Sequence, residues 1–182
     1  ATEEVVIDEP LAIALSSAST PALCFGSSEG TIDLTVSGGT APYTYDWNNG
    51  TYTDQDPQGV LAGSYSVIVT DDNGCTAVES VQVGQPDAIS VNIDNVSNYG
   101  GTNVSCADAT DGSAEASVGG GGTAPFSYEW SNGSQIALAE NLAAQDYFVT
   151  VTDGNGCTSV GSVSLDAPDA VLLNVDITNP DC

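Results

Sequence analysis

Hydrophobic and polar residues alternate along several short segments of the chain. Residues 31–36, 43–47 and 65–70 place β-branched, aliphatic or aromatic side chains at every second position, which is the period of a strand with one buried face. Only residues 136–145 have a composition that favours a helix. We expect a loop or a single turn there, because the corresponding first-half segment contains Pro57 and glycines. The pattern therefore predicts an all-β chain.

The chain contains two copies of one module. The segment that begins at Cys24, CFGSSEGTIDLTVSGGTAPYTYDWNNGT, matches the segment that begins at Cys106, CADATDGSAEASVGGGGTAPFSYEWSNGS. The later halves of the two copies match as well and carry Cys75 and Cys157 at the same offset. Repetition at this length indicates separately folded domains in series, because solenoid repeats are usually shorter.

Prolines divide the chain into four segments. We expect residues 1–10 to be the end of a preceding repeat, residues 11–86 and 87–168 to be complete repeat units, and residues 169–182 to be the start of a following repeat. About seven short strands in a unit of this size, separated by Asn-Gly turns, are typical of an Ig-like β-sandwich.

Five cysteines occur as two equally spaced pairs and one more. We predict disulfides within the units, Cys24 with Cys75 and Cys106 with Cys157, since a zinc site would need CxxC spacing or His. Cys182 would pair with a partner outside the segment. The predicted fold class is thus all-β, with tandem Ig-like β-sandwich domains, each stapled by one disulfide, arranged as an extended array. Disulfides also imply an oxidising, extracellular location.

The charge of the chain excludes several classes of function. Asp and Glu number 25, while Lys, Arg and His are absent, so the formal net charge is −25. Nucleic acid is excluded as a partner, because binding its phosphates requires basic side chains. No run of 18 apolar residues is present for a membrane span. With no His for proton transfer and no Lys for a Schiff base, we predict no catalytic residues and no enzymatic activity.

Acidic turns are the candidate metal sites. Oxygen ligands without competing ammonium groups favour calcium over softer metals. The candidate ligands are Asp71, Asp72, Asn73, Asp153, Asn155, Asp108 and Asp111. The alternative is that each DxNG sequence is a tight structural turn and that no cofactor is bound.

Aromatic side chains repeat at one position of the module. Trp47 and Trp130 follow Tyr45 and Tyr128 in the sequences TYDWNNG and SYEWSNG. We expect the tryptophans to lie in the sandwich core, packed on the disulfide. The alternative is stacking on a sugar ring, which requires an exposed aromatic side chain.

Taken as a set, these motifs resemble the SprB repeat, a module arrayed in very large surface adhesins of gliding Bacteroidota. The shared pattern includes GGTAPY or GGTAPF, YxWxNG, VTDxNGC and a terminal proline, and it covers essentially all of residues 11–168. The second unit departs from the first at residues 143–147, where AAQDY replaces the glycine-containing strand start. The resemblance implies export by the type IX secretion system, display on the cell surface, and a role in adhesion or gliding motility.

Three hypotheses of function follow. The leading hypothesis is a non-catalytic stalk of a very large secreted adhesin or filament, whose partners are neighbouring repeats of the same chain and an external surface or polysaccharide. The alternatives are an extracellular polysaccharide- or calcium-binding module, or the subunit of a self-assembling fibre that forms by filament self-association. Exposure of the tryptophans discriminates between them, because buried indoles favour the stalk.

Overall fold

A computed structural model describes residues 11–48 and 50–173 of the chain. These residues form strands, turns and loops, with no helix among them, and therefore no helix that could cross a membrane. The chain divides into two compact units between Asp87 and Ala88. Residues 1–10 and 174–182, on which the predicted flanking repeats largely fall, lie outside the described residues.

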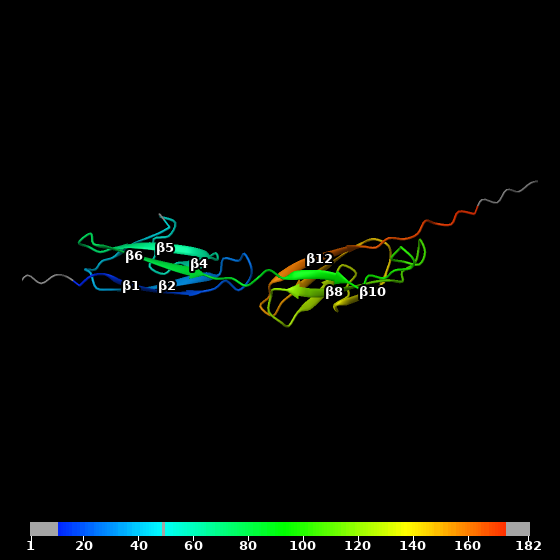
Figure 1. The fold of residues 1–182 in the computed structure, drawn as a ribbon, viewed down its shortest axis with the longest axis horizontal. Helices are drawn as coiled ribbons and strands as arrows, with labels where there is room; N and C mark the ends of the chain where they lie inside the picture. Colours follow the sequence, from blue (N-terminus) through cyan, green and yellow to red (C-terminus); the bar gives the residue numbers. More distant parts are fainter. Residues whose placement is uncertain (1–10, 49, 174–182) are drawn as a thin grey trace, which may run out of the picture. The chain divides into compact units, whose positions relative to one another are not determined.

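Six antiparallel strands build the first unit. They are β1 (Ala14–Thr20), β2 (Gly30–Ser37), β3 (Thr44–Trp47), β4 (Gln58–Val60), β5 (Gly63–Thr70) and β6 (Thr76–Val83). One sheet has the order β1-β2-β4 and the other has the order β3-β5-β6. Figure 1 shows these two layers, with β1 and β2 in one and β5 and β6 in the other.

The second unit repeats this arrangement. Its strands are β7 (Ser90–Asp94), β8 (Gly112–Gly120), β9 (Ser127–Trp130), β10 (Leu138–Leu142), β11 (Asp146–Thr152) and β12 (Thr158–Ser164). Its sheets have the orders β7-β8-β10 and β9-β11-β12. Each unit is thus a two-layer antiparallel sandwich, which confirms the predicted all-β, Ig-like fold class with six rather than about seven strands per unit.

The core of the first unit follows the period-two pattern of its strands. In β5, Tyr65, Val67 and Val69 are buried, while Ser66 and Ile68 between them are exposed. The buried side chains of both sheets form one cluster: Ile32, Leu34, Trp47, Val60, Tyr65, Val67, Val69 and Val83. Because successive strand residues point to opposite faces, this alternation fixes which face of each sheet is covered.

The second unit fills the same space with different side chains. Ala114 and Ala116 of β8 are buried where β2 of the first unit supplies the larger Ile32 and Leu34. Val104, in the longer loop before β8, is fully buried. The longer loop thus contributes to the core, which is consistent with the need to fill volume left by the smaller β8 residues.

A tyrosine at the start of the central strand ties each unit to its preceding turn. The Tyr65 hydroxyl donates a hydrogen bond to the Leu61 carbonyl oxygen at 2.8 Å. In the second unit, the Tyr147 hydroxyl accepts a hydrogen bond from the Ala143 amide at 3.0 Å. A tyrosine bonded to backbone a few residues upstream is a feature of Ig-like sandwiches. It explains why both modules carry tyrosine here.

Residues 136–145 differ from the expectation of a loop or single turn. Leu138–Leu142 form strand β10, which pairs with β8 and contains a register shift between Glu140 and Leu142. Ala139 and Leu142 are fully buried. The prediction was wrong because a short segment with helix-favouring composition gains more from burial and edge pairing than from its local propensity.

Candidate functional site

The cysteines are the first candidate site, and their bonding states contradict the predicted pairs. Cys24 and Cys157 are disulfide-bonded, whereas Cys75 and Cys106 are exposed free thiols. The within-unit disulfides Cys24–Cys75 and Cys106–Cys157 are therefore not formed. Cys182 lies outside the described residues.

The physical reason is that the two cysteines of a unit lie at opposite ends of its sandwich. The loop that holds Cys24 is bonded to the end of β6, since the Ala22 amide donates to the Gly84 carbonyl oxygen at 3.0 Å. Cys75 precedes the start of β6. A strand of this length spans on the order of 25 Å, whereas the Cα atoms of a disulfide lie within about 7 Å of each other.

The acidic turn of the first unit is held by its own backbone. One Asp71 carboxylate oxygen accepts hydrogen bonds from the amides of Asn73 (3.0 Å) and Cys75 (2.8 Å). The other oxygen accepts the Thr40 amide at 3.0 Å. The Asn73 side chain adds a bond to the Thr40 hydroxyl at 2.9 Å. The turn is thereby fixed both to itself and to the GGTAP loop.

The second unit repeats the same bonds. Asp153 accepts the amides of Asn155 (2.9 Å) and Cys157 (2.8 Å) on one oxygen, and the Thr123 amide (2.9 Å) on the other. The Asn155 side chain donates to the Thr123 hydroxyl at 3.2 Å. The positive φ of Gly156, 86°, closes the turn in a conformation that favours glycine. The DxNG motif is thus a structural turn in both units.

Amide donors also set the charge state of the two buried aspartates. Asp71 and Asp153 are each 6% exposed. Burial favours the neutral acid and would raise the pKa of each carboxyl group, but the backbone amides bonded to the carboxylate outweigh burial and hold both pKa values below the ordinary one. Both side chains are consequently anionic at neutral pH.

The remaining calcium candidates do not join these aspartates. Asp72 and Asp108 are exposed, and one Asp111 carboxylate oxygen accepts a hydrogen bond from the Ser105 amide at 3.1 Å. Hydrogen bonds from Ser105 lower the pKa of Asp111. Among the described residues, no group of three or more His, Cys, Asp or Glu side chains is arranged to hold a metal ion. Calcium binding stays an untested prediction, and the structure shows turns at these positions.

Both tryptophans lie in the cores of their units. Trp47 is 0% exposed and Trp130 is 2% exposed. Each indole nitrogen donates to a backbone carbonyl oxygen, Trp47 to Asp54 at 3.0 Å and Trp130 to Ile136 at 3.1 Å. Their rings are therefore not available for stacking on a sugar.

The neighbouring tyrosines are partly buried at the edge of the core. The Tyr45 hydroxyl donates to the Gln55 side-chain oxygen at 2.9 Å. Burial raises the pKa of Tyr45, and the negative charge of Asp56 adds to the shift. Tyr128 holds the equivalent position and is also half-buried.

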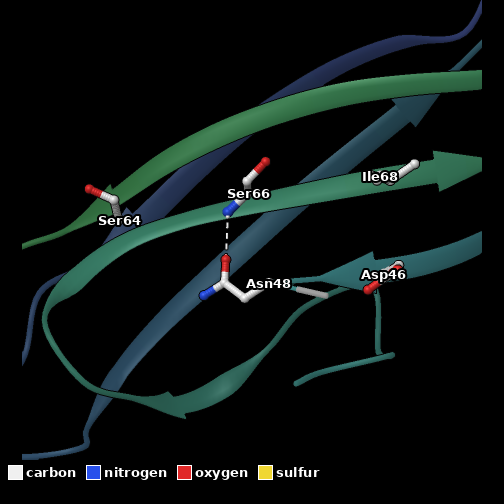
Figure 2. A pocket seen from close by; sticks show the side chains of 5 residues that line it. All are labelled: Asp46, Asn48, Ser64, Ser66 and Ile68. Carbon is white, nitrogen blue, oxygen red and sulfur yellow. Dashed lines mark hydrogen bonds between the residues drawn. The ribbon is translucent and has the colours of Figure 1, made fainter. Parts of the chain in front are cut away.

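A shallow depression on the outer face of β3 and β5 went unnoticed in the sequence. It has a volume of about 310 Å³ and is lined by Asp46, Asn48, Ser64, Ser66 and Ile68. Figure 2 shows the Asn48 side-chain oxygen directed at the Ser66 amide, to which it is bonded at 2.9 Å. Asn48 has a positive φ of 45°, so the chain turns away from β3 here. In the sequence, the only signal for this surface is that polar residues occupy the outward-facing positions of the strands.

The corresponding surface of the second unit has different chemistry. Its depression, of about 390 Å³, is lined by Glu129, Trp130, Ser131, Gly133, Phe148 and Thr150. Ser131 takes the role of Asn48, because its hydroxyl accepts the Phe148 amide at 3.2 Å. Phe148 is 53% exposed where the first unit has Ser66. The two units thus share the position of the depression but not a set of ligand-binding groups.

Comparisons with known proteins agree with the motif analysis. Residues 16–52 and 101–135 each match the family model of the SprB repeat, which confirms the resemblance inferred from the sequence. A search of curated proteins found no match to this chain.

Several solved structures are similar to the chain at low sequence identity. The amphioxus IgVJ-C2 molecule is 14% identical, with 88% of this chain and 99% of that chain covered and a TM-score of 0.32. A structure that describes the basis for Dscam isoform specificity is 11% identical over 88% of this chain and 47% of that chain, with a TM-score of 0.33. The crystal structure of Dpr2 Ig1–Ig2 in complex with DIP-Theta Ig1–Ig3 is 11% identical over 86% of this chain and 65% of that chain, with a TM-score of 0.34.

Proposed function

We propose that this chain, in which two segments match the SprB repeat family, is a non-catalytic structural stalk segment of a very large secreted cell-surface adhesin or filament. Its repeats extend an adhesin or filament from the cell and serve surface adhesion and gliding motility. Export by the type IX secretion system and display at the cell surface belong to the same proposal. The partners of this segment are neighbouring repeats of the same chain, and the external surface or polysaccharide is a partner of the adhesin as a whole.

One observation carries the proposal: the side chains that recur in both units are used to hold the fold. The tryptophans are buried, and the turn aspartates are bonded to backbone amides. The β3–β5 depression, by contrast, changes from Ser66 to Phe148 between units. The two units thus share the side chains that hold the fold but do not share a ligand-binding surface, as expected of a stalk.

Composition supports a non-catalytic role. The chain has no His, Lys or Arg, so general acid–base chemistry would rest on carboxylates, as in glycosidases. In the part of the chain that the structure describes, the buried carboxylates are those of Asp71 and Asp153. Each already accepts three amide hydrogen bonds. Their lowered pKa values are the opposite of what a general acid near neutrality requires.

A binding experiment distinguishes the stalk from a ligand-binding module. The purified chain is titrated with calcium and with a panel of soluble polysaccharides by calorimetry, while acrylamide quenching reports exposure of Trp47 and Trp130. We expect no saturable heat of binding. We also expect acrylamide to quench the tryptophan fluorescence only as weakly as it quenches a buried indole. Saturable binding of calcium or of one polysaccharide class would contradict the stalk and support the module.

An in-frame deletion tests the role in the producing cell. Removal of residues 11–168 from the full-length gene is expected to shorten the surface filament seen by electron microscopy while display and attachment persist. Normal display combined with complete loss of attachment would overturn the proposal, because it would place the adhesive site within these units.

A further inference from the structure

We propose that the first and last strands of each unit form a mechanical clamp, a set of contacts that resists tension applied along the chain. These strands are β1 and β6 in the first unit and β7 and β12 in the second. The inference deepens the proposed function and rests on it for its purpose, because a stalk that extends from a cell is loaded between its two ends. All of the contacts that form the clamp lie inside a single unit.

The first and last strands of the first unit lie next to each other on one side of the sandwich. Each is an edge strand of its own sheet, since the two sheets have the orders β1-β2-β4 and β3-β5-β6. The two strands contact each other although they belong to different sheets. Contacts between them therefore join the strand by which the chain enters the unit directly to the strand by which it leaves.

Serine side chains of β1 form hydrogen bonds to β6. The Ser17 hydroxyl donates to a Glu79 carboxylate oxygen at 3.1 Å, and this bond is partly buried. The Ser19 hydroxyl donates to the Gln82 carbonyl oxygen at 2.7 Å. Neither bond belongs to a sheet, because β1 pairs through its backbone with β2, and β6 pairs with β5. These hydroxyls thus connect the two sheets at their edges.

The order of the bonded residues shows that β1 and β6 run parallel. Between Ser17 and Ala22, the bonded partner moves along the chain from Glu79 to Gly84. The start of β1 and the end of β6 therefore lie at opposite ends of the unit. Tension between the two ends pulls the strands past each other in opposite directions, so that these bonds are loaded together. In an antiparallel hairpin pulled at its open end, the bonds would instead break one after another.

The second unit has the same arrangement with different contacts. The Val104 amide donates to the Asp166 carbonyl oxygen at 3.2 Å, which repeats the backbone bond that follows β1 and β6 in the first unit. Strands β7 and β12 contact each other. A Cβ atom at Gly161 of β12 would lie 2.7 Å from the Val91 side chain and 3.3 Å from the Ile93 side chain of β7. Apolar packing on a glycine thus takes the place of the serine hydrogen bonds.

Contacts loaded in this way raise the barrier to forced unfolding. The response of a domain to tension is governed by its unfolding rate rather than by its equilibrium stability. The sandwich cannot open from its ends until β1 has moved past β6, so every bond between these strands has to break first. Removing such bonds should therefore speed unfolding under end-to-end tension more than it speeds unfolding under tension in another direction.

Serine variants of the full chain test the clamp of the first unit. Single chains are held at constant force between their two ends, with a reductant present so that no disulfide carries the load. The double variant Ser17→Ala, Ser19→Ala is expected to unfold its first unit on the order of tenfold faster than wild type. The second unit serves as the internal reference and should keep its rate. The matched control is Ser16→Ala, Ser80→Ala, which removes two exposed hydroxyls from the same strands and should change neither rate.

A second pulling direction separates a mechanical role from a general loss of stability. Cys75 is an exposed free thiol that immediately precedes β6. It lies at the end of the unit where β1 begins, because a Cβ atom at Gly39 would lie 3.1 Å from the Asp71 carboxylate of the same turn, and the Gly39 amide donates to the Leu11 carbonyl oxygen at 2.7 Å. With the other cysteines replaced by serine, a handle at Cys75 and one at the N-terminus pull β1 and β6 apart from one end. We expect the first unit to open at a lower force than in end-to-end pulling.

Two results would overturn the clamp. One is an unfolding rate of the Ser17→Ala, Ser19→Ala variant equal to that of wild type under end-to-end tension. The other is an equal opening force in the two pulling directions, a comparison that needs no change in β1 or β6. Either result would leave the stalk in place, whereas saturable binding of calcium or a polysaccharide would contradict the stalk and leave the clamp in place.

Discussion

In both units, a buried aspartate at the same turn stabilises that turn by accepting hydrogen bonds from its backbone amides. Asp71 and Asp153 are candidate calcium ligands by sequence, and in the structure each carboxylate accepts hydrogen bonds from amides of its own turn and of the GGTAP loop. Sequence alone predicted the turn and the acidic residue. It could not tell amide donors from a cation, because both stabilise the same charge.

These aspartates give the stability of the chain a defined pH dependence. Because their pKa values are lowered by folding, their contribution is fully present above the ordinary aspartate pKa of about 3.9. It is lost as the pH falls through the lowered values. We expect the double variant Asp71→Asn, Asp153→Asn to be less stable than wild type at neutral pH and to show a shallower loss of stability on acidification.

Urea unfolding followed by tryptophan fluorescence at a series of pH values measures this difference. Asp72→Asn, at the exposed neighbour of Asp71, is the control for removing one negative charge. An acid dependence in the double variant as steep as that of wild type would show that the amide-bonded carboxylates are not its source.

At the scale of strands, the alternation of hydrophobic and polar residues predicted the central strands well and the edge strands poorly. Residues 31–36 and 65–70 lie within β2 and β5 with the expected faces buried, because long strands with one covered face leave a clear period-two signal. Strand β10 gave no such signal. Its five residues include an alanine, a glutamate and a positive-φ residue, Asn141, and its strand conformation depends on pairing with β8.

Two glycines of β8 differ in how closely other atoms pack around them, so they allow the effect of packing to be measured apart from that of strand propensity. A Cβ atom at Gly112 would lie 2.7 Å from the Leu165 side chain and 2.8 Å from the Leu142 carbonyl oxygen, whereas no atom lies within 4 Å of a Cβ atom at Gly120. We expect Gly112→Ala to destabilise the second unit by about 1–3 kcal/mol. Gly120→Ala should be neutral or slightly stabilising, because alanine restricts the unfolded chain.

Thermal and urea unfolding of the two variants provide the comparison. Both substitutions add one methyl group to the same strand. Any general effect of alanine on stability therefore cancels in the comparison of the two variants. Equal effects of the two substitutions would contradict the packing described for the end of β8.

At the scale of the whole chain, the repeat predicted the modules but not how their cysteines pair. Equal spacing of the cysteines suggested a loop closed inside each unit. The chain, however, crosses the first sandwich in β2, returns through β3 and β4, and crosses again in β5, so Cys75 emerges at the end opposite Cys24. Spacing along a sequence does not report the end of a sandwich at which a residue emerges, and this prediction failed for that reason.

The distribution of charge also belongs to this scale. All 25 charged side chains are acidic and occur in both units, so repulsion between chains opposes close lateral packing. A stalk benefits from such a surface because it stays solvated and separate.

Pulling a single chain from its two ends, with a reductant present, tests the account of a stalk built from separately folded units most directly. We predict two separate unfolding events, one for each of the two compact units. A single unfolding event for the whole chain, or extension without any force peak, would contradict the account.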